Sequence, residues 1–295
     1  MDRKLLEKVW VMTLTNGGYK ANLMKAERLV DNRIHNLPPG KAMMAIPIHC
    51  LPGSPDGWVR GPGSYVVEVD AEHGLWFDFT GNDKYNTAIV PTVKGMNPIT
   101  GLKTEDVGIH QYREECPIHH VPFGHKYFCE ECGYKWPAQN YVSHPNVLWW
   151  DGFRQTDGSV RQFFFTEEDK RDIASAIIGK KNTVPAFGFA FYRCKNDKSP
   201  KGMNLKRYSS PQAGSNFLKK SQERFNKDVS VGAGARISQS LEIDKTPLKE
   251  WGDSPESVIT LYFVFSEQLE QIVEKGGIKK LESKPEGYLE NVSVG

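Results

Sequence analysis

The sequence predicts an α+β fold with mainly antiparallel sheet, a few capped helices and one inserted metal-binding segment. Three observations favour this fold. Short segments of alternating or continuous hydrophobicity recur along the chain, and turn signals separate them. The 27 glycines and 18 prolines among 295 residues favour strands and turns over long helices. Cysteines and histidines gather in one short stretch between segments that resemble strands.

Residues 1–110 are predicted to form a β-rich N-terminal part. A short helix from Lys4 should run into a strand that ends at the turn Asn16-Gly17-Gly18. Residues 19–34 show a loose helical spacing of apolar side chains and are predicted to be a helix. Further strands are expected at 42–51, 65–70, 75–80 and 85–93, of which the second and third should pair as a hairpin.

Residues 141–282 are predicted to form a C-terminal α+β part. Its clearest signal is a hairpin between 147–155 and 160–165, because Asp157-Gly158 readily takes the positive φ angles of a tight turn. Thr166, followed by three acidic residues, is predicted to cap a helix. Strands are expected at 184–194, 229–243 and 258–265, a helix capped by Ser266 at 267–275, and a frayed tail at 283–295.

The sequence Gly232-Ala233-Gly234 interrupts one of these strands. It lacks the third glycine and the following helix of a dinucleotide-binding loop, so it indicates a bulge or a close approach of two backbones. Sequence motifs of serine hydrolases, P-loop enzymes and zinc proteases do not occur, and no catalytic or cofactor-binding residue is predicted. The pair His49-Cys50 is adjacent on one strand, which favours a buried thiol.

Residues 111–140 are predicted to form an inserted metal-binding segment, which contains three of the five cysteines. Cys116 and His119 are separated by two residues, Cys129 and Cys132 are separated by two residues, and nine residues lie between the two pairs. Each pair on a tight turn places two donor atoms on one side of the backbone, and two such turns complete the tetrahedron that Zn²⁺ prefers. A redox dithiol is the alternative for Cys129 and Cys132, but such dithiols usually open a helix, and the surrounding residues do not indicate one.

Residues 116–136 resemble the short zinc-ribbon family, whose members read roughly CPxCGxxVPxGxKFCxxCGxxW. The matching positions are Cys116-Pro117, Val121-Pro122, Gly124, Lys126, Phe128-Cys129 and Cys132-Gly133. His119 stands where the family has a cysteine, and His120 stands where it has a glycine. The resemblance implies a structural Zn²⁺ bound by Cys116, His119, Cys129 and Cys132, with His120 or His125 as alternative fourth ligands.

A basic segment at residues 193–228 is the second candidate for function. It holds ten Lys or Arg against three acids, a net charge of +7 on a chain whose total is +2. The possible partner-binding residues are Lys206, Arg207, Lys219, Lys220 and Arg224. Cations beside aromatic residues suit single-stranded nucleic acid, but such a segment also commonly meets an acidic protein surface.

We expect from these features a non-enzymatic cytoplasmic protein that binds other proteins or self-assembles, with a structural zinc ribbon as its docking surface. A nucleic-acid-binding protein that uses residues 193–228 and a zinc-dependent enzyme are the alternatives. The apolar runs are too short to span a membrane, and the five cysteines fit a reducing compartment better than a disulfide framework. Cys50 and Cys194 are expected to be buried thiols.

Overall fold

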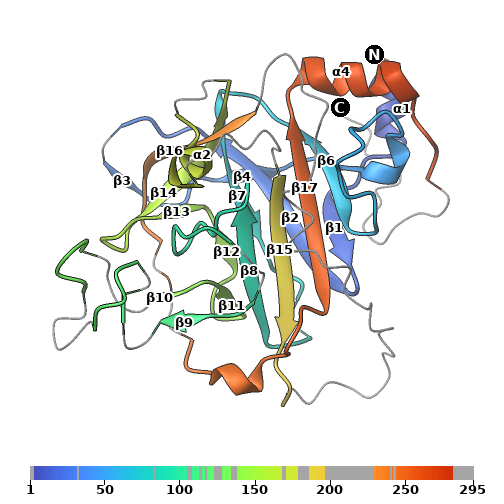
Figure 1. Ribbon diagram of the computed structural model, residues 1–295. Helices are drawn as coiled ribbons and strands as arrows, with labels where there is room; N and C mark the ends of the chain where they lie inside the picture. Colours follow the sequence, from blue (N-terminus) through green and yellow to red (C-terminus); the bar gives the residue numbers. More distant parts are fainter. Residues whose placement is uncertain are drawn as a thin grey trace.

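The computed structural model describes most of the chain, and its sheets form the body of the protein (Figure 1). The described residues are 3–31, 33–82, 84–104, 108–112, 115–116, 118–122, 128–133, 138–167, 171–178, 186–196, 229–239, 241 and 244–281. Most strand pairs among them are antiparallel and the helices are few and short, so the sheet-rich, mainly antiparallel character of the predicted fold is confirmed.

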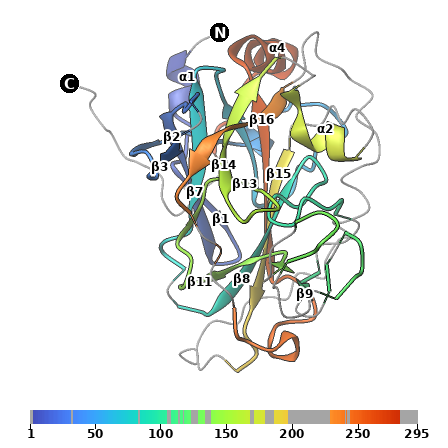
Figure 2. The same cartoon turned by 90° about the vertical axis from the view of Figure 1, so that its left-hand side faces the viewer.

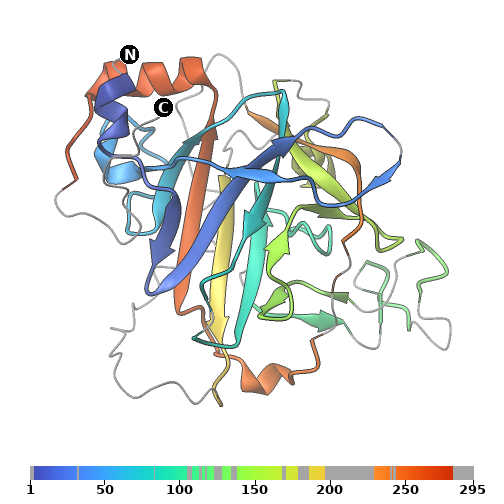
Figure 3. The same ribbon diagram turned by 180° about the vertical axis from the view of Figure 1, so that it is seen from behind.

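The larger sheet has nine strands. Six of them follow one another in the order β1 (Thr13–Asn16), β2 (Tyr19–Glu27), β7 (His73–Asp78), β14 (Val160–Thr166), β16 (Ser230–Ile237) and β3 (Ile34–His35). Three short strands pair with members of this path: β4 (Gly40–Ala42) with β2, β12 (Trp149–Trp150) with β7, and β13 (Gly152–Arg154) with β14. Only β16 and β3 run parallel in the described part of this sheet. Figure 3 views the molecule from the side of β1 and β2.

The second sheet has six strands in the order β11 (Val142–His144), β8 (Thr87–Val93), β15 (Ala186–Arg193), β17 (Ser257–Val264), β6 (Ser64–Glu68) and β5 (Ile46–Pro47). Its β17 and β6 run parallel. A separate two-stranded ladder joins β9 (Gln111–Tyr112) to β10 (Ala138–Gln139). Both larger sheets draw strands from before residue 110 and from after residue 141.

The two larger sheets pack against each other through an aromatic core, and Figure 2 shows them as two layers. The ring of Phe77 on β7 lies 4.6 Å from the ring of Phe189 on β15, edge to face. The rings of Phe165 and Phe263 likewise lie 4.7 Å apart across the two sheets. Ring contacts of this kind stabilise a core beyond the area they bury, so these pairs fix how the sheets face each other.

The six-stranded sheet is covered on its other face as well. On β17, Leu261 and Phe263 belong to the core between the sheets, whereas Tyr262 and Val264 belong to a second cluster with residues of α1 (Arg3–Glu7) and α4 (Ser266–Gly276). This explains why residues 258–265 are apolar without alternation. None of the helices in the described ranges is both long and apolar enough to cross a membrane.

Three other short helical segments complete the described structure: η1 (Ile48–Cys50), α2 (Ile173–Ile178) and η4 (Leu248–Glu250). Cys50 and Cys194 are both buried, as predicted. Burial raises the pKa of the Cys50 thiol to about 11, so this thiol stays protonated at neutral pH and packs as a small apolar side chain.

The hairpin around Asp157-Gly158 is confirmed. β13 pairs with β14 from Arg154 opposite Val160, and Gly158 has a φ of +86°. The Asp157 carboxylate accepts a hydrogen bond from the backbone N–H of Ser159 at 2.9 Å. Local turn chemistry therefore decides this pairing.

The predicted hairpin of residues 65–70 and 75–80 is wrong, although both strands exist. β6 pairs with β17 and β5 in the six-stranded sheet, whereas β7 pairs with β2 and β14 in the nine-stranded sheet. The connection between β6 and β7 crosses from one layer to the other. Hydrophobic alternation identifies a strand but does not choose its partner, and here the partners lie far away in sequence.

The helix predicted at residues 19–34 is also wrong. Residues 19–27 form β2, where Tyr19, Ala21 and Leu23 are buried and the residues between them are more exposed. Burial that alternates with a period of two is typical of a strand. Pairing with a neighbouring strand on each side overrides the helical propensity of the Lys, Met and Ala residues in this segment. Thr166, the predicted helix cap, is the last residue of β14 instead.

One buried ion pair connects three distant parts of the fold. Lys94 follows β8 and is 2 % exposed, and its ammonium group contacts the carboxylate of Asp172, which directly precedes α2. The same ammonium donates a hydrogen bond to the carbonyl of Val229, just before β16, at 3.2 Å. A buried charge is tolerated only when it is paired, so this contact ties α2 and β16 to the end of β8.

Candidate metal centre

Four side chains predicted as ligands lie together in the structure. The ligand atoms of Cys116, His119, Cys129 and Cys132 are all within 4.8 Å of one another. The sulfur of Cys116 lies 3.7 Å from that of Cys132, and the sulfur of Cys129 lies 3.5 Å from Nδ1 of His119. Each close contact therefore joins one residue of the first pair to one residue of the second. The four residues are close enough to hold a metal ion.

Two tight turns position the ligands. In the first, the backbone N–H of His120 donates to the carbonyl of Cys116 at 2.9 Å, and His120 takes a positive φ of +55°. In the second, the N–H of Gly133 donates to the carbonyl of Cys129 at 2.8 Å, and Gly133 has a φ of +71°. Each turn therefore brings its fourth residue back toward its first, which places the two ligand residues of each pair close together.

The structure distinguishes His119 from His120. His119 directs Nδ1 toward the sulfur of Cys129, and its Nε2 lies 3.9 Å from a carboxylate oxygen of Glu131. His120 points elsewhere, with its Nδ1 3.3 Å from a carboxylate oxygen of Glu115, and its side chain is largely exposed. A carboxylate near the second ring nitrogen orients a ligating histidine. His125, the third candidate, lies outside the described residues.

The surroundings of Cys129 favour its thiolate. Burial raises the pKa of the Cys129 thiol, but hydrogen bonds from the backbone N–H of Cys132, from His119 and from the backbone N–H of Glu131 outweigh it and lower the pKa to about 7. The thiolate is the form of cysteine that binds metal. The N–H of Ile118 likewise points to the sulfur of Cys116 at 3.4 Å.

The β9–β10 ladder closes the base of the segment that holds the four candidate ligands. Tyr112 pairs with Ala138, and Gln111 pairs with Gln139, so the chain leaves and returns at the same place. The adjoining Asn140 accepts a hydrogen bond from the backbone N–H of His110 at 2.8 Å and donates one to the carbonyl of Gly108 at 2.7 Å. Figure 1 shows this segment at the edge of the molecule, beside the short strands β9 and β10.

The residues predicted to bind a partner cannot be compared with the structure. Lys206, Arg207, Lys219, Lys220 and Arg224 all lie outside the described residues, as does every position from 197 to 228. Of the basic segment, the structure places only 193–196, where Lys195 pairs with Asp253 at 2.8 Å.

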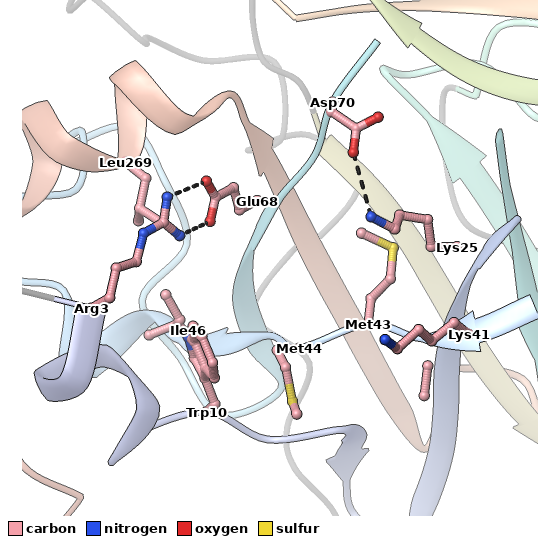
Figure 4. Close-up of a pocket in the computed structure, with 11 residues that line it drawn as sticks. Arg3, Trp10, Lys25, Lys41, Met43, Met44, Ile46, Glu68, Asp70 and Leu269 are labelled. Carbon is pink, nitrogen blue, oxygen red and sulfur yellow. Dashed lines mark hydrogen bonds and ion pairs between the residues drawn. The ribbon is translucent and has the colours of Figure 1, made fainter. Parts of the chain in front are cut away.

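A separate hollow of about 250 Å³ lies beside α1 and the first residue of β5 (Figure 4). Its two carboxylates are each paired with a cation: Glu68 accepts hydrogen bonds from the guanidinium of Arg3, and Asp70 lies 3.6 Å from Lys25. Burial raises the pKa of Glu68, but the Arg3 guanidinium and the Ser266 hydroxyl reverse this shift and lower it. Arg3 also donates to the hydroxyl of Ser266 at 2.8 Å, so these charges serve to hold α1 against α4.

A buried carboxyl group without a partner was not indicated by the sequence. Asp151, between β12 and β13, is fully buried, and neither carboxylate oxygen has a hydrogen-bond partner among the described residues. Burial raises its pKa to about 7. An aspartate after two tryptophans gives no sequence signal for this, because only the packed sheets decide that it is buried.

We expect this carboxyl to make stability depend on pH. The folded state keeps the Asp151 proton up to about pH 7, whereas an unfolded aspartate loses it near pH 4. The free energy of unfolding should therefore fall as pH rises from about 4 to 7 and then level off, by at most about 4 kcal/mol at about 1.4 kcal/mol per pKa unit. Asp151→Asn should remove this slope. Urea unfolding of both proteins from pH 5 to pH 8 measures it, and identical slopes would contradict the assignment.

Comparison of the chain with protein-family models, with curated proteins and with solved structures finds no match. The resemblance of residues 116–136 to zinc ribbons therefore rests on the residues and their geometry.

Proposed function

We propose that this chain is a non-enzymatic structural protein that self-assembles or binds another protein, and that Zn²⁺ stabilises the segment 111–140 as its docking surface. The observation that carries this proposal is the set of three cysteines and one histidine with ligand atoms within 4.8 Å of one another, on a segment whose two ends pair in the β9–β10 ladder. A cytoplasmic location is part of the proposal, because this set needs reduced thiols.

The distances between the candidate ligand atoms suit tetrahedral Zn²⁺. Two sulfurs at roughly 2.3 Å from a tetrahedral Zn²⁺ are separated by roughly 3.8 Å, and a sulfur and a nitrogen by roughly 3.6 Å. The pairs Cys116–Cys132 and Cys129–His119 have 3.7 Å and 3.5 Å. Thiolate ligands also exclude Mg²⁺ and Ca²⁺, which bind oxygen.

A structural role follows from the number of ligands. Catalytic zinc sites have three protein ligands and keep the fourth position for water or substrate. Here four side chains can fill the tetrahedron, which leaves no place for a reacting molecule. Zinc then supplies folding energy to a segment too small to have its own apolar core.

The docking role rests on apolar side chains beside the ligands. Ile118, between two ligands, is 41 % exposed, and Phe128, directly before Cys129, is 38 % exposed. In a metal-bound segment these side chains are held in fixed positions, so they lose little conformational entropy when a partner covers them. Aromatic side chains of this kind are also common at the centres of protein interfaces.

The double substitution Ile118→Ser and Phe128→Ser tests this role. Zinc-loaded wild-type protein is expected to exceed the 33.3 kDa of one chain in light scattering, and the double variant should shift toward that mass while keeping its zinc. Leu248→Ser is the matched control, because Leu248 is 45 % exposed but lies on η4, outside the segment.

Removal of zinc with a chelator should have the same effect as the double substitution. A wild-type protein that has the mass of one chain with and without zinc would contradict self-assembly. A catalytic turnover that a chelator abolishes while fold and assembly persist would contradict the structural role and favour the enzyme.

A further inference from the structure

In a second hollow, which we call the arginine groove, the charged side chains among the described lining residues are all arginines. It has a volume of about 480 Å³ and lies where the chain leaves β2, along β14 and β16 and beside the start of α2. Arg28, Arg161 and Arg171 line it, and no carboxylate occurs among its described lining residues. The three arginines come from positions far apart in sequence, so folding alone brings their charges together.

Arg161 is held in place with part of its guanidinium unused. Its Nε donates to the carbonyl of Gly234 on the neighbouring strand at 2.7 Å. Neither of its two terminal nitrogens has a hydrogen-bond or ion-pair partner in the described part of the chain. Because these nitrogens carry four N–H donors, an anion in the groove can accept hydrogen bonds from a guanidinium whose position is already fixed.

Arg28 is fixed by a different set of contacts. Its guanidinium lies over the ring of Phe164 at 3.8 Å from the centroid and donates to the carbonyl of Ala71 at 2.6 Å. The ring of Phe164 in turn lies on Gly232, where an added Cβ would come within 2.3 Å of it. The predicted close approach of another backbone is found at Gly234, where an added Cβ would lie 3.1 Å from the carbonyl oxygen of Leu29. Gly232 instead leaves room for the ring of Phe164, on which the guanidinium of Arg28 lies.

The position of Arg161 destabilises the nine-stranded sheet. Its cross-strand partner in the β14–β16 pairing is Arg236, and like charges directly opposite each other destabilise a sheet. Arg236 has a counter-charge, Asp157, at 3.8 Å. Arg161 has none among the described residues. The charge of Arg161 therefore repels that of Arg236 and neutralises no carboxylate among the described residues. Such a charge favours a role in binding an anion.

We propose that the arginine groove binds a small organic diphosphate. Guanidinium groups match phosphate oxygens with paired hydrogen bonds, and three of them on separate elements suit an anion with more than one charged group. A volume of about 480 Å³ lies in the range of small-molecule sites. The exposed Val30 and the partly buried Ile173 add apolar surface for the organic part.

Calorimetric titration of the full zinc-loaded chain tests the proposal, with pyrophosphate, ADP and citrate as probes. Arg161→Gln should weaken pyrophosphate and ADP binding by roughly tenfold to a hundredfold, the usual effect of losing charge-assisted hydrogen bonds. Arg236→Gln is the matched control, because it removes the same charge from the opposite residue outside the groove, and it should change the affinity less than about threefold. Circular dichroism melting confirms that both variants fold.

The three probes distinguish an organic diphosphate from an inorganic phosphate and from a carboxylate as the ligand. Tighter binding of ADP than of pyrophosphate supports an organic diphosphate, whereas tighter pyrophosphate identifies the inorganic ion as the ligand and overturns the organic part. Citrate that binds best would overturn phosphate as the class. Absence of binding at millimolar concentration, or an equal loss in Arg236→Gln, would overturn the site. Because the groove does not involve the metal ligands, zinc removal should leave pyrophosphate affinity unchanged, which keeps this test independent of the proposed docking function.

Discussion

Cys129→Ser is expected to abolish metal binding, whereas purified wild-type protein should contain close to one zinc ion per chain. Serine has no soft thiolate, and the remaining ligands no longer complete the tetrahedron. Structural zinc in finger peptides contributes roughly 10 to 16 kcal/mol of apparent binding free energy, so the loss should be complete at ordinary zinc concentrations. Elemental analysis by mass spectrometry measures the zinc content.

The sheets should survive this substitution, because their aromatic core does not include the ligands. Far-ultraviolet circular dichroism should therefore change little, while backbone NMR signals of residues 115–133 should lose dispersion. Full unfolding of the chain on loss of zinc would show that the segment is not an independent attachment.

Two histidine variants identify the fourth ligand. His119→Ala is expected to lose most of the zinc affinity, and His120→Ala is the control that should keep it, because His120 contacts Glu115 rather than the cysteines. His125→Ala completes the series. Zinc loss in His120→Ala or His125→Ala with retention in His119→Ala would reassign the ligand.

Lys94→Met is expected to lower the free energy of unfolding by about 3 to 5 kcal/mol, the usual cost of leaving one partner of a buried ion pair without its counter-charge. The group left without a counter-charge is the carboxylate of Asp172, which is itself buried. The double variant with Asp172→Leu should recover most of this loss, because it removes both charges together. Urea unfolding of the four proteins in a double-mutant cycle gives the coupling energy.

Lys195→Met provides the matched control for this cycle. Lys195 pairs with Asp253 at 2.8 Å, but the side chains are 43 % and 93 % exposed. Exposed pairs contribute at most about 1 kcal/mol, so this variant should be nearly as stable as the wild type. Equal losses in Lys94→Met and Lys195→Met would show that burial is not what makes the first pair matter.

Local features of this chain could be predicted from its sequence. The Asp157-Gly158 sequence marks the β13–β14 hairpin because Gly158 supplies a positive φ and Asp157 accepts a hydrogen bond from the backbone of Ser159 within the same turn. The spacing of Cys129 and Cys132 likewise places two sulfurs on one turn, whatever the rest of the chain does. The strand at 258–265 also matches its signal, since burial on both faces requires continuous apolar residues. The helix that follows is present at Ser266–Gly276, but Phe265 rather than Ser266 is its N-cap.

Contacts between distant residues were decided only by the tertiary structure. The partners of β6 and β7 lie in different sheets. Tyr19–Glu27 is a strand because β1 and β7 pair with it on its two sides. His119 rather than His120 faces Cys129 because the fold of the first turn directs one ring inward and the other toward Glu115.

The charged sites depend on the same distant contacts. Lys94 meets Asp172 across 78 positions of sequence, and the arginine groove joins the end of β2 to β14 and β16. Turn and ligand spacings are short-range and survive in any fold, so the sequence by itself determined the candidate metal ligands and several of the strands. Burial, partner choice and the convergence of charges depend on how two sheets pack, which no local pattern encodes.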